Sequence, residues 1–381
     1  MRIVLAGGGT GGHLFPGIAL AEELRRRDPT TRIVLLCTRR DEAYEGTQAL
    51  GISSEVLPST NRGPLPRRLL ALAPALLRAM RVLGRFRPDV VIGLGGYGSV
   101  APVVCAALRG IPCMLLEQNV VPGRSNRLMS HLADEVACQW EESAGYLRRR
   151  DKVRVTGNPV RAAIRRHGRA EAAAALGLDP ALPTLLVMGG SQGARPLNEL
   201  AVEALPTLRE RGARLQFVHL AGEADLERVR AAYEQQGLAA RVFGFLVDMA
   251  LAYSACDLVL SRAGGTSIAE LTALGLPMIL VPYPHAMDNH QHLNARVLEL
   301  AGAALLLEQA TLSPHRLAHH VSELLGDRAR LAHMARQSQR FGVPRAAAVV
   351  ADRIAALADG RRRDRPPLVS RLLARRGRAL E

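Results

Sequence analysis

Lysine is almost absent from this 381-residue sequence, because Lys152 is the only lysine among 50 basic residues. A P-loop needs a lysine directly after its glycine-rich turn, so this chain cannot form one. Aromatic residues are also scarce, at 3% of the total, and no helix-turn-helix, zinc-finger or RNA-recognition motif occurs. Nucleic acid is therefore not expected as a partner, although the formal net charge is +15.

Paired cysteines and long apolar runs are missing as well. No run of about 18 uncharged apolar residues occurs, and the first residues lack the pattern of a secretory signal. We therefore expect a protein of the cytoplasm. The cysteines form no CxxC pair and lie in apolar segments, which indicates reduced, mostly buried thiols. They are Cys37, Cys105, Cys113, Cys138 and Cys256.

Part of the positive charge lies at the end of the chain. Residues 361–381 hold eight arginines against Asp364 and Glu381, a local net charge of +6. Such a run predicts either a disordered, solvated extension or an electrostatic contact with an anionic surface.

Short apolar runs alternate with longer helical patterns, which is typical of parallel strands covered on both faces by helices. The strand-like runs are IVLAG, RIVLLCT, DVVIGLG and IPCMLLE, and the scheme repeats with TLLVMGGSQGA, RLQFVHLAG, DLVLSRAGG and PMILVPY. The pattern predicts an α/β protein with two Rossmann-like, doubly wound domains joined near residues 156–161. A ligand is expected in the cleft at the carboxyl ends of both sheets.

The glycine-rich loop at residues 7–12 follows the first predicted strand. Gly7, Gly9 and Gly12 satisfy the dinucleotide pattern GxGxxG, but the second strand ends in Arg39 and Arg40 instead of an acidic residue. NAD is therefore disfavoured, and NADP stays open. The loop presents main-chain amides at the start of a helix, which suits an anion or a bulky polar ligand. The alternative is a tight turn without a ligand.

Seven sequence segments then resemble one known family. In chain order they are GGGTGGHLFPGIALAEEL, GLGGYGSVAP, LEQN, TGNPVR, GGSQGA, RAGGTSIAEL and PHAMDNHQ. Together they resemble the MurG family, GT-B glycosyltransferases of family 28, over roughly residues 1–358. The resemblance implies inverting transfer of GlcNAc from UDP-GlcNAc to the C4 hydroxyl of MurNAc in undecaprenyl-pyrophosphoryl-MurNAc-pentapeptide, a step of peptidoglycan synthesis.

The resemblance also implies a division of labour between two facing domains. Residues 1–158 would bind the acceptor and the cytoplasmic face of the plasma membrane, with a helix at about 343–358 packing back on them. Residues 159–342 would bind UDP-GlcNAc. No metal or other cofactor is implied, and other cell-wall synthesis proteins are conceivable partners. The pair DxD, with which metal-dependent transferases commonly hold a cation, occurs nowhere in the chain.

Donor-binding residues follow from the same motifs. Ser191 would contact the diphosphate, Glu270 the ribose hydroxyls, and the main chain at Leu246 the uracil, with helix starts stabilising the leaving phosphate. The register between His290 and Gln291 stays open, and Glu270 could instead be a first-turn charge favoured by the helix dipole. The full set is Thr10, Gly11, Gly12, Asn119, Arg161, Ser191, Leu246, Gly265, Thr266, Ser267, Ile268, Ala269, Glu270, His290 and Gln291.

His13 is the candidate catalytic base. The acceptor hydroxyl must lose a proton as it attacks, and an imidazole ordinarily titrates near neutrality. The alternatives are that His13 only orients substrate, or that Glu117 takes the proton. The candidate acceptor-binding residues lie in the two glycine-rich loops of the first domain, and they are Gly9, Gly95, Gly96, Tyr97 and Ser99.

The segment 67–88 predicts a basic amphipathic helix. Arg78, Arg81 and Arg85 recur at helical spacing beside a leucine-rich face, which suits either an anionic membrane surface or ordinary packing on the core. The apolar positions are Leu69, Leu70, Leu72, Leu76, Leu77, Met80 and Leu83.

Two other functions use comparable sequence features. A UDP-GlcNAc 2-epimerase could share the paired domains, and an NADP-binding oxidoreductase could use the first loop with Arg39 and Arg40.

Overall fold

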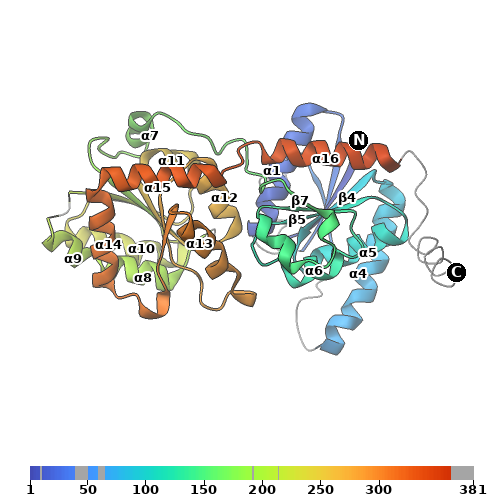
Figure 1. The fold of residues 1–381 in the computed structure, drawn as a ribbon, viewed down its shortest axis with the longest axis horizontal. Coiled ribbons are helices and arrows are strands. Elements are labelled where there is room, and N and C mark those ends of the chain that lie inside the picture. Colours follow the sequence, from blue (N-terminus) through green and yellow to red (C-terminus); the bar gives the residue numbers. More distant parts are fainter. Residues whose placement is uncertain (9–10, 39–49, 59–64, 191–192, 213, 362–381) are drawn as a thin grey trace. The chain divides into compact units, whose positions relative to one another are not determined.

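The computed structural model in Figure 1 describes residues 1–8, 11–38, 50–58, 65–190, 193–212 and 214–361. The chain divides into two compact units. Unit 1 comprises Met1–Ala162 and the chain from Pro344 on, and unit 2 comprises Ala163–Val343. None of the described helices combines the length and the apolar composition that a membrane-spanning helix requires.

The described part of unit 1 contains a parallel sheet of seven strands in the order β3-β2-β1-β4-β5-β6-β7. Alternate residues of β1 enter different apolar clusters: Val4 and Ala6 face one side, and Ile3 and Leu5 face the other. Both faces of the sheet are therefore covered, as the continuous apolar runs predict. The strands are β1 (Arg2–Gly7), β2 (Arg32–Cys37), β3 (Ser53–Val56), β4 (Val90–Gly95), β5 (Cys113–Glu117), β6 (Glu135–Cys138) and β7 (Val153–Val155).

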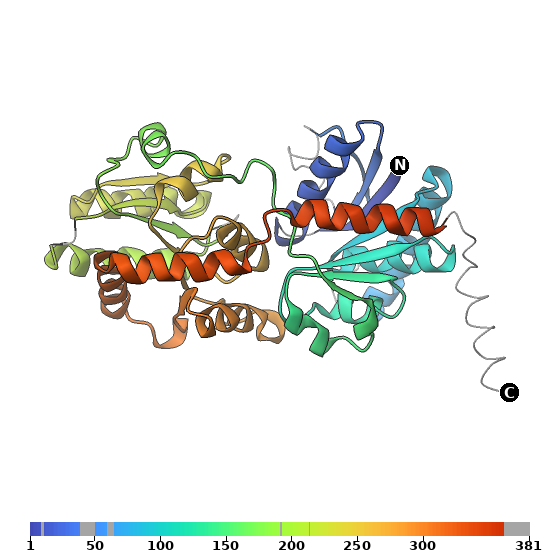
Figure 2. The same ribbon diagram turned by 45° about the horizontal axis from the view of Figure 1, so that its top comes forward.

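Five α-helices described in unit 1 cover this sheet. They are α1 (Gly11–Arg27), α4 (Leu65–Phe86), α5 (Val100–Leu108), α6 (Arg124–Met129) and α16 (Ala346–Arg361). Figures 1 and 2 show α16, in red, beside α1 in blue, and Val350 and Ile354 of α16 join the apolar cluster of α1. The guanidinium of Arg353 also pairs with the buried carboxylate of Glu135, the first residue of β6. The last described helix is therefore part of unit 1.

The only lysine of the sequence stabilises the main chain after a helix. Lys152 donates from its ammonium group to the main-chain carbonyls of Ser130, His131 and Ala133, just after α6. Its charge therefore compensates carbonyl groups at a helix end.

Unit 2 contains, in its described part, a parallel sheet of six strands in the order β10-β9-β8-β11-β12-β13. They are β8 (Thr184–Met188), β9 (Gln216–Leu220), β10 (Ala240–Phe243), β11 (Leu258–Ser261), β12 (Met278–Leu280) and β13 (Ala304–Leu306). The helices are α7 (Arg169–Ala175), α8 (Arg195–Glu203), α9 (Leu205–Glu210), α10 (Leu226–Gln236), α11 (Met249–Ala255), α12 (Gly265–Ala273), α13 (His290–Leu300), α14 (Pro314–Gly326) and α15 (Arg328–Phe341).

Both sheets reverse their strand order next to their first strand. The reversal lies between β1 and β4 in unit 1 and between β8 and β11 in unit 2. In doubly wound sheets, ligands bind outside the carboxyl ends of the strands at such a switch point. The glycine-rich loops after β1 and β8 therefore begin where this fold class places its ligands.

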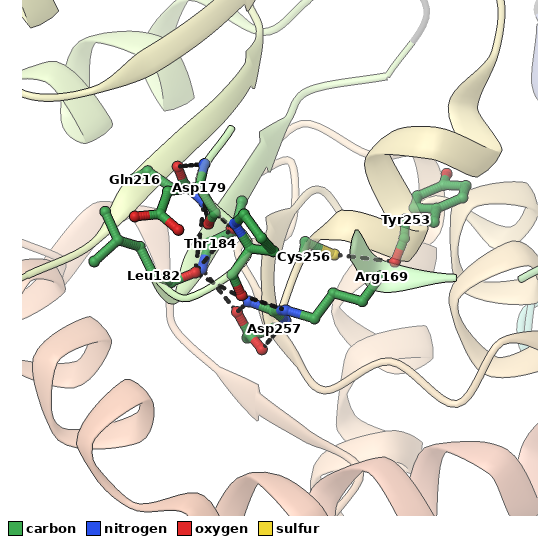
Figure 3. A network of polar contacts seen from close by, with 9 residues as sticks. Arg169, Asp179, Leu182, Thr184, Gln216, Tyr253, Cys256 and Asp257 are labelled. Atoms are coloured by element: carbon green, nitrogen blue, oxygen red, sulfur yellow. Dashed lines mark hydrogen bonds and ion pairs between the residues drawn. The ribbon is translucent and has the colours of Figure 1, made fainter. Parts of the chain in front are cut away.

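A polar network fixes the amino ends of three neighbouring strands in unit 2 (Figure 3). The carboxylate of Asp257, just before β11, pairs with the guanidinium of Arg169 and accepts the Thr184 N–H at 2.7 Å. The Gln216 side chain donates to the Thr184 hydroxyl at 2.9 Å and to the Asp179 carbonyl at 2.7 Å. Strands β9, β8 and β11 are thus held together at the ends away from the glycine-rich loop.

Candidate active site

The ends of β1 and β4 approach closely because both are glycine. A Cβ atom built on Gly7 would lie 2.5 Å from the Gly95 carbonyl oxygen. Gly95 and Gly96 have φ angles of +105° and +72°, which other residues adopt only with strain. These glycines let the two loops meet at the switch point of unit 1.

His13 lies on this pair of loops. It is the third residue of α1 and is half-buried. A Cβ on Gly95 would lie 2.7 Å from His13 Cδ2 and 3.0 Å from Nε2. The imidazole therefore rests on the main chain at the end of β4, and its position depends on the absence of a side chain there.

The other acceptor candidates of this loop differ in exposure. Tyr97 is half-buried, whereas Ser99 is fully buried and its hydroxyl donates to the Gly96 carbonyl at 2.8 Å. The Ser99 side chain therefore fixes the loop that leads into α5. Gly9 and Thr10 of the first glycine-rich loop lie outside the described residues.

Glu117 ends β5 and organises the loop that follows. Its buried carboxylate accepts the main-chain N–H groups of Asn119 and Gly123, each at 3.0 Å, and the side-chain amides of Asn119 at 3.3 Å and Asn126 at 2.8 Å. Burial raises the pKa of Glu117, and these hydrogen bonds oppose the rise. Because four donors converge on it, the geometry favours an organising role for Glu117 over that of a base.

Asn119 and Arg161 are both in unit 1. The Asn119 side chain is held by Glu117, and the main-chain carbonyl of Asn119 accepts the Ser143 hydroxyl at 3.0 Å. The guanidinium carbon of Arg161 lies 4.7 Å from the centroid of the Phe15 ring, within the range of a cation–π contact. Since Phe15 is in α1, Arg161 lies against the helix that carries His13, Gly11 and Gly12.

In unit 2, the loop after β8 also depends on glycine. Gly190 and Gly193 have φ angles of +101° and +71°, and a Cβ on Gly193 would lie 2.2 Å from the Ala221 carbonyl oxygen. The loop after β8 therefore packs against the end of β9. Ser191 lies outside the described residues.

The start of α12 carries six of the donor candidates, and they are Gly265, Thr266, Ser267, Ile268, Ala269 and Glu270. The side chains of Ile268 and Ala269 are buried in the core, so only their main chain could meet a ligand. Glu270 is 5% exposed and is the sixth residue of the helix. The alternative of a first-turn charge is therefore wrong. Its Oε2 atom accepts the Tyr253 hydroxyl at 2.7 Å.

Arg262, directly before this turn, is a buried charge that sequence reasoning missed. Its guanidinium donates to the carbonyls of Val281 and Pro282 at 3.0 and 3.1 Å and to the Gln309 side chain at 2.6 Å. Burial lowers the pKa of Arg262. These three acceptors are neutral, so Arg262 contributes positive potential near the start of α12.

The remaining donor candidates of unit 2 lie on one loop and at the start of one helix. Leu246 is half-buried in the segment before α11. His290 and Gln291 open α13: the His290 Nδ1 atom lies 2.8 Å from the Met287 carbonyl, and Gln291 Oε1 accepts the Tyr283 N–H at 2.9 Å. The Gln291 amide oxygen therefore holds the loop between β12 and α13.

Sequence reasoning also missed a buried network of hydrogen-bonded side chains behind the loop after β8. His219 is fully buried, with Nε2 3.1 Å from the Asn198 Oδ1 atom and Nδ1 3.0 Å from the Tyr233 hydroxyl. Asn198 also donates to Asp225 at 2.9 Å. Burial lowers the pKa of His219 to about 3, so the imidazole is neutral. Sequence spacing offers no signal for such a network, because its members come from α8, β9, α10 and the short turn before α10.

Within the described ranges, no three His, Cys, Asp or Glu side chains are grouped so that they could hold a metal ion.

The two sheets, with a glycine-rich loop after the first strand of each, define a two-domain α/β protein of the GT-B glycosyltransferase class. The chain belongs to glycosyltransferase family 28. Residues 3–138 match the N-terminal domain model of that family and residues 184–350 match its C-terminal domain model.

Relatives are similar over nearly the whole chain. A UDP-N-acetylglucosamine–N-acetylmuramyl-(pentapeptide) pyrophosphoryl-undecaprenol N-acetylglucosamine transferase from Nitratidesulfovibrio vulgaris is 45% identical, over 94% of this chain and 98% of the relative. The protein of the same name from Geobacter sulfurreducens is 39% identical, over 93% and 98%.

Solved structures give the same fold. Acinetobacter baumannii MurG matches with a TM-score of 0.75 and 28% identity, over 93% of this chain and 99% of that one. A UDP-GlcNAc 2-epimerase from Neisseria meningitidis matches with a TM-score of 0.66, over 93% and 100%, but at 15% identity. The second likeness concerns the fold alone.

Proposed function

We propose that this chain transfers GlcNAc from UDP-GlcNAc to the C4 hydroxyl of MurNAc in undecaprenyl-pyrophosphoryl-MurNAc-pentapeptide, with inversion at the anomeric carbon. The observation that carries the proposal is the identity of 45% over 94% of the chain to a transferase named for this reaction. The 2-epimerases share only the fold, and Arg39 and Arg40, on which an NADP site would depend, lie outside the described residues.

Unit 2 would bind the donor. As UDP leaves, negative charge grows on the diphosphate, and the main-chain amides at the starts of α8 and α12 would stabilise it. Arg262 adds positive potential next to α12. Glu270 would accept the ribose hydroxyls, the loop at Leu246 would contact uracil, and the Gln291 amide would contact the sugar.

Unit 1 would bind the acceptor. The amides of the loops after β1 and β4, at Gly95, Gly96 and Tyr97, would hold the lipid-linked pyrophosphate. His13 would take the proton of the attacking hydroxyl, or else orient that hydroxyl while water takes the proton. The contact of its ring with Gly95 supports either role, because it fixes the imidazole at the loop that would bind the acceptor.

A peripheral contact with the cytoplasmic face of the membrane completes the proposal. Most of the apolar face of α4 is used by the core, since Leu72, Leu76 and Met80 pack on it and Leu83 is buried. Leu77 is 60% exposed, and Arg81 is exposed one turn away. Leu69 and Leu70 belong to α4, but their side chains lie outside the described ones. We propose that the exposed strip of α4 lies against anionic lipid.

The decisive assay measures transfer of radiolabelled sugar from UDP-GlcNAc to lipid-linked MurNAc-pentapeptide, with UDP-GalNAc as the specificity control. We expect labelled lipid and UDP release only when donor and acceptor are both present. Isomerisation of UDP-GlcNAc without acceptor would favour an epimerase, and consumption of reduced nicotinamide would favour an oxidoreductase.

A further inference from the structure

Tyr253 joins three segments of unit 2 at one buried hydroxyl group. The side chain lies on α11 and is 1% exposed, and its hydroxyl donates to Glu270 Oε2 at 2.7 Å. The same oxygen lies 3.8 Å from the sulfur of Met188, the last residue of β8. The loop that contains Leu246 runs directly into α11.

The main chain at Tyr253 is also anchored. The Cys256 thiol donates to the Tyr253 carbonyl at 3.5 Å, and the next residue, Asp257, belongs to the network at the amino ends of the strands (Figure 3). The phenol therefore projects from a fixed support toward the carboxyl end of β8 and the Glu270 carboxylate on α12.

We propose that Tyr253 is a positioning residue for the donor nucleotide. Its hydroxyl holds the Glu270 carboxylate in the orientation that accepts the ribose hydroxyls of a uridine diphosphate sugar. The inference rests on the proposed function, in which Glu270 binds the ribose.

Two physical reasons support this role. The terminal torsion of a glutamate is soft, so a carboxylate without a fixed donor samples many orientations. A buried hydroxyl that donates to a carboxylate forms a charge-assisted hydrogen bond, which fixes the group before the ligand arrives and lowers the entropic cost of binding. A phenol does this without placing a cation on the carboxylate.

The test compares UDP with 2′-deoxy-UDP by calorimetric titration of the full chain, its Tyr253→Phe and Glu270→Gln variants, and a matched control. The control is Tyr233→Phe, which removes an equally buried hydroxyl of unit 2 that contacts His219 instead. We expect the unaltered chain to prefer UDP by about 10-fold or more, the size of one charge-assisted hydrogen bond.

In Tyr253→Phe, we expect this preference to fall by about 5-fold or more, with a smaller loss of affinity for 2′-deoxy-UDP because that nucleotide offers Glu270 only its 3′ hydroxyl. Tyr233→Phe should keep the preference. Two results would overturn the positioning role alone. In one, Tyr253→Phe lowers the affinities for both nucleotides equally. In the other, Tyr253→Phe keeps the preference for UDP while Glu270→Gln loses it. If Glu270→Gln keeps the preference, the ribose contact of the proposed function is wrong, and the inference fails with it.

Discussion

The position of His13, on helix α1, depends on Gly95 at the end of strand β4. Its ring occupies the space that a side chain at Gly95 would fill, and that contact joins the start of α1 to the end of β4. A base must be held within hydrogen-bond reach of the proton it removes, so this contact is the structural support for the proposed role of His13.

Replacing His13 tests that role. We expect His13→Ala to lower kcat by about 100-fold or more, the usual contribution of general-base catalysis, without a matching loss of UDP-GlcNAc affinity. Steady-state kinetics and calorimetric titration would measure both quantities. His131→Ala, at an exposed histidine of the same unit, is the control and should behave as the unaltered chain. Near-normal turnover in His13→Ala would remove this residue from the mechanism.

His219 predicts a pH dependence of stability. Its pKa is about 3 in the folded chain, against an ordinary value of 6.5, so the unfolded chain binds more protons between these values. The neutral His219 therefore contributes fully to the free energy of unfolding above about pH 6.5, and this contribution is lost as the pH falls toward 3. When the pH is lowered from 7 to 5, the free energy of unfolding should fall by about 2 kcal/mol more in the unaltered chain than in His219→Gln, as measured by urea unfolding. The same loss in both chains would contradict this account.

Some residue contacts of the candidate site could not be predicted from the sequence. Glu270 could be proposed from its motif, but Tyr253 is seventeen positions away in an apolar helix, where a tyrosine resembles an ordinary core residue. Arg262 stands inside a quoted motif, yet only the fold shows that its guanidinium is buried among carbonyl groups. Contacts between elements are not visible in local patterns.

At the scale of elements, burial decided which strands could be predicted. The eight apolar runs correspond to β1, β2, β4, β5, β8, β9, β11 and β12, and these predictions are confirmed. Strands β3, β7 and β10 were missed because they are short and partly exposed at sheet edges. Strand β13 is likewise a partly exposed edge strand, and β6, although buried, was missed because its short run EVAC begins with a charged residue.

Two glycines in the loop after β4 allow a matched pair of substitutions that tests how His13 is held. We expect Gly95→Ala to lower the free energy of unfolding by about 1–3 kcal/mol, because its φ of +105° strains any other residue, and to lower kcat because the methyl group displaces His13. Gly98→Ala in the same loop meets only ordinary contacts at 3.6 Å or more, so it should be nearly neutral. Thermal unfolding and kinetics on both variants check this. Equal effects would mean that His13 is not held by Gly95.

Helix α4 carries the membrane prediction. We expect Leu77→Glu to weaken binding to vesicles that contain anionic lipid by about 10-fold or more, since burying a leucine contributes about 1.5–3 kcal/mol. Leu128→Glu on α6 is the control, because Leu128 is similarly exposed at 62%. Co-sedimentation at several salt concentrations measures the binding. Binding that ignores both lipid charge and salt would count against the proposal.

At the scale of the whole molecule, the repeated order of strands and glycine-rich loops was enough to predict two doubly wound units. The order of both sheets confirms it. The reaction did not follow from that pattern, because the same architecture is shared by a 2-epimerase at 15% identity. The resemblance of seven motifs supplied the substrates, and the relatives carry the names of that transferase.

We propose that main-chain nitrogens at helix starts, together with Arg262, stabilise the departing UDP without a bound cation. The most direct test is the initial rate of GlcNAc transfer to the lipid-linked acceptor, measured with excess EDTA and again after addition of Mg²⁺. We expect the same rate under both conditions. A rate abolished by the chelator and restored by magnesium would contradict it.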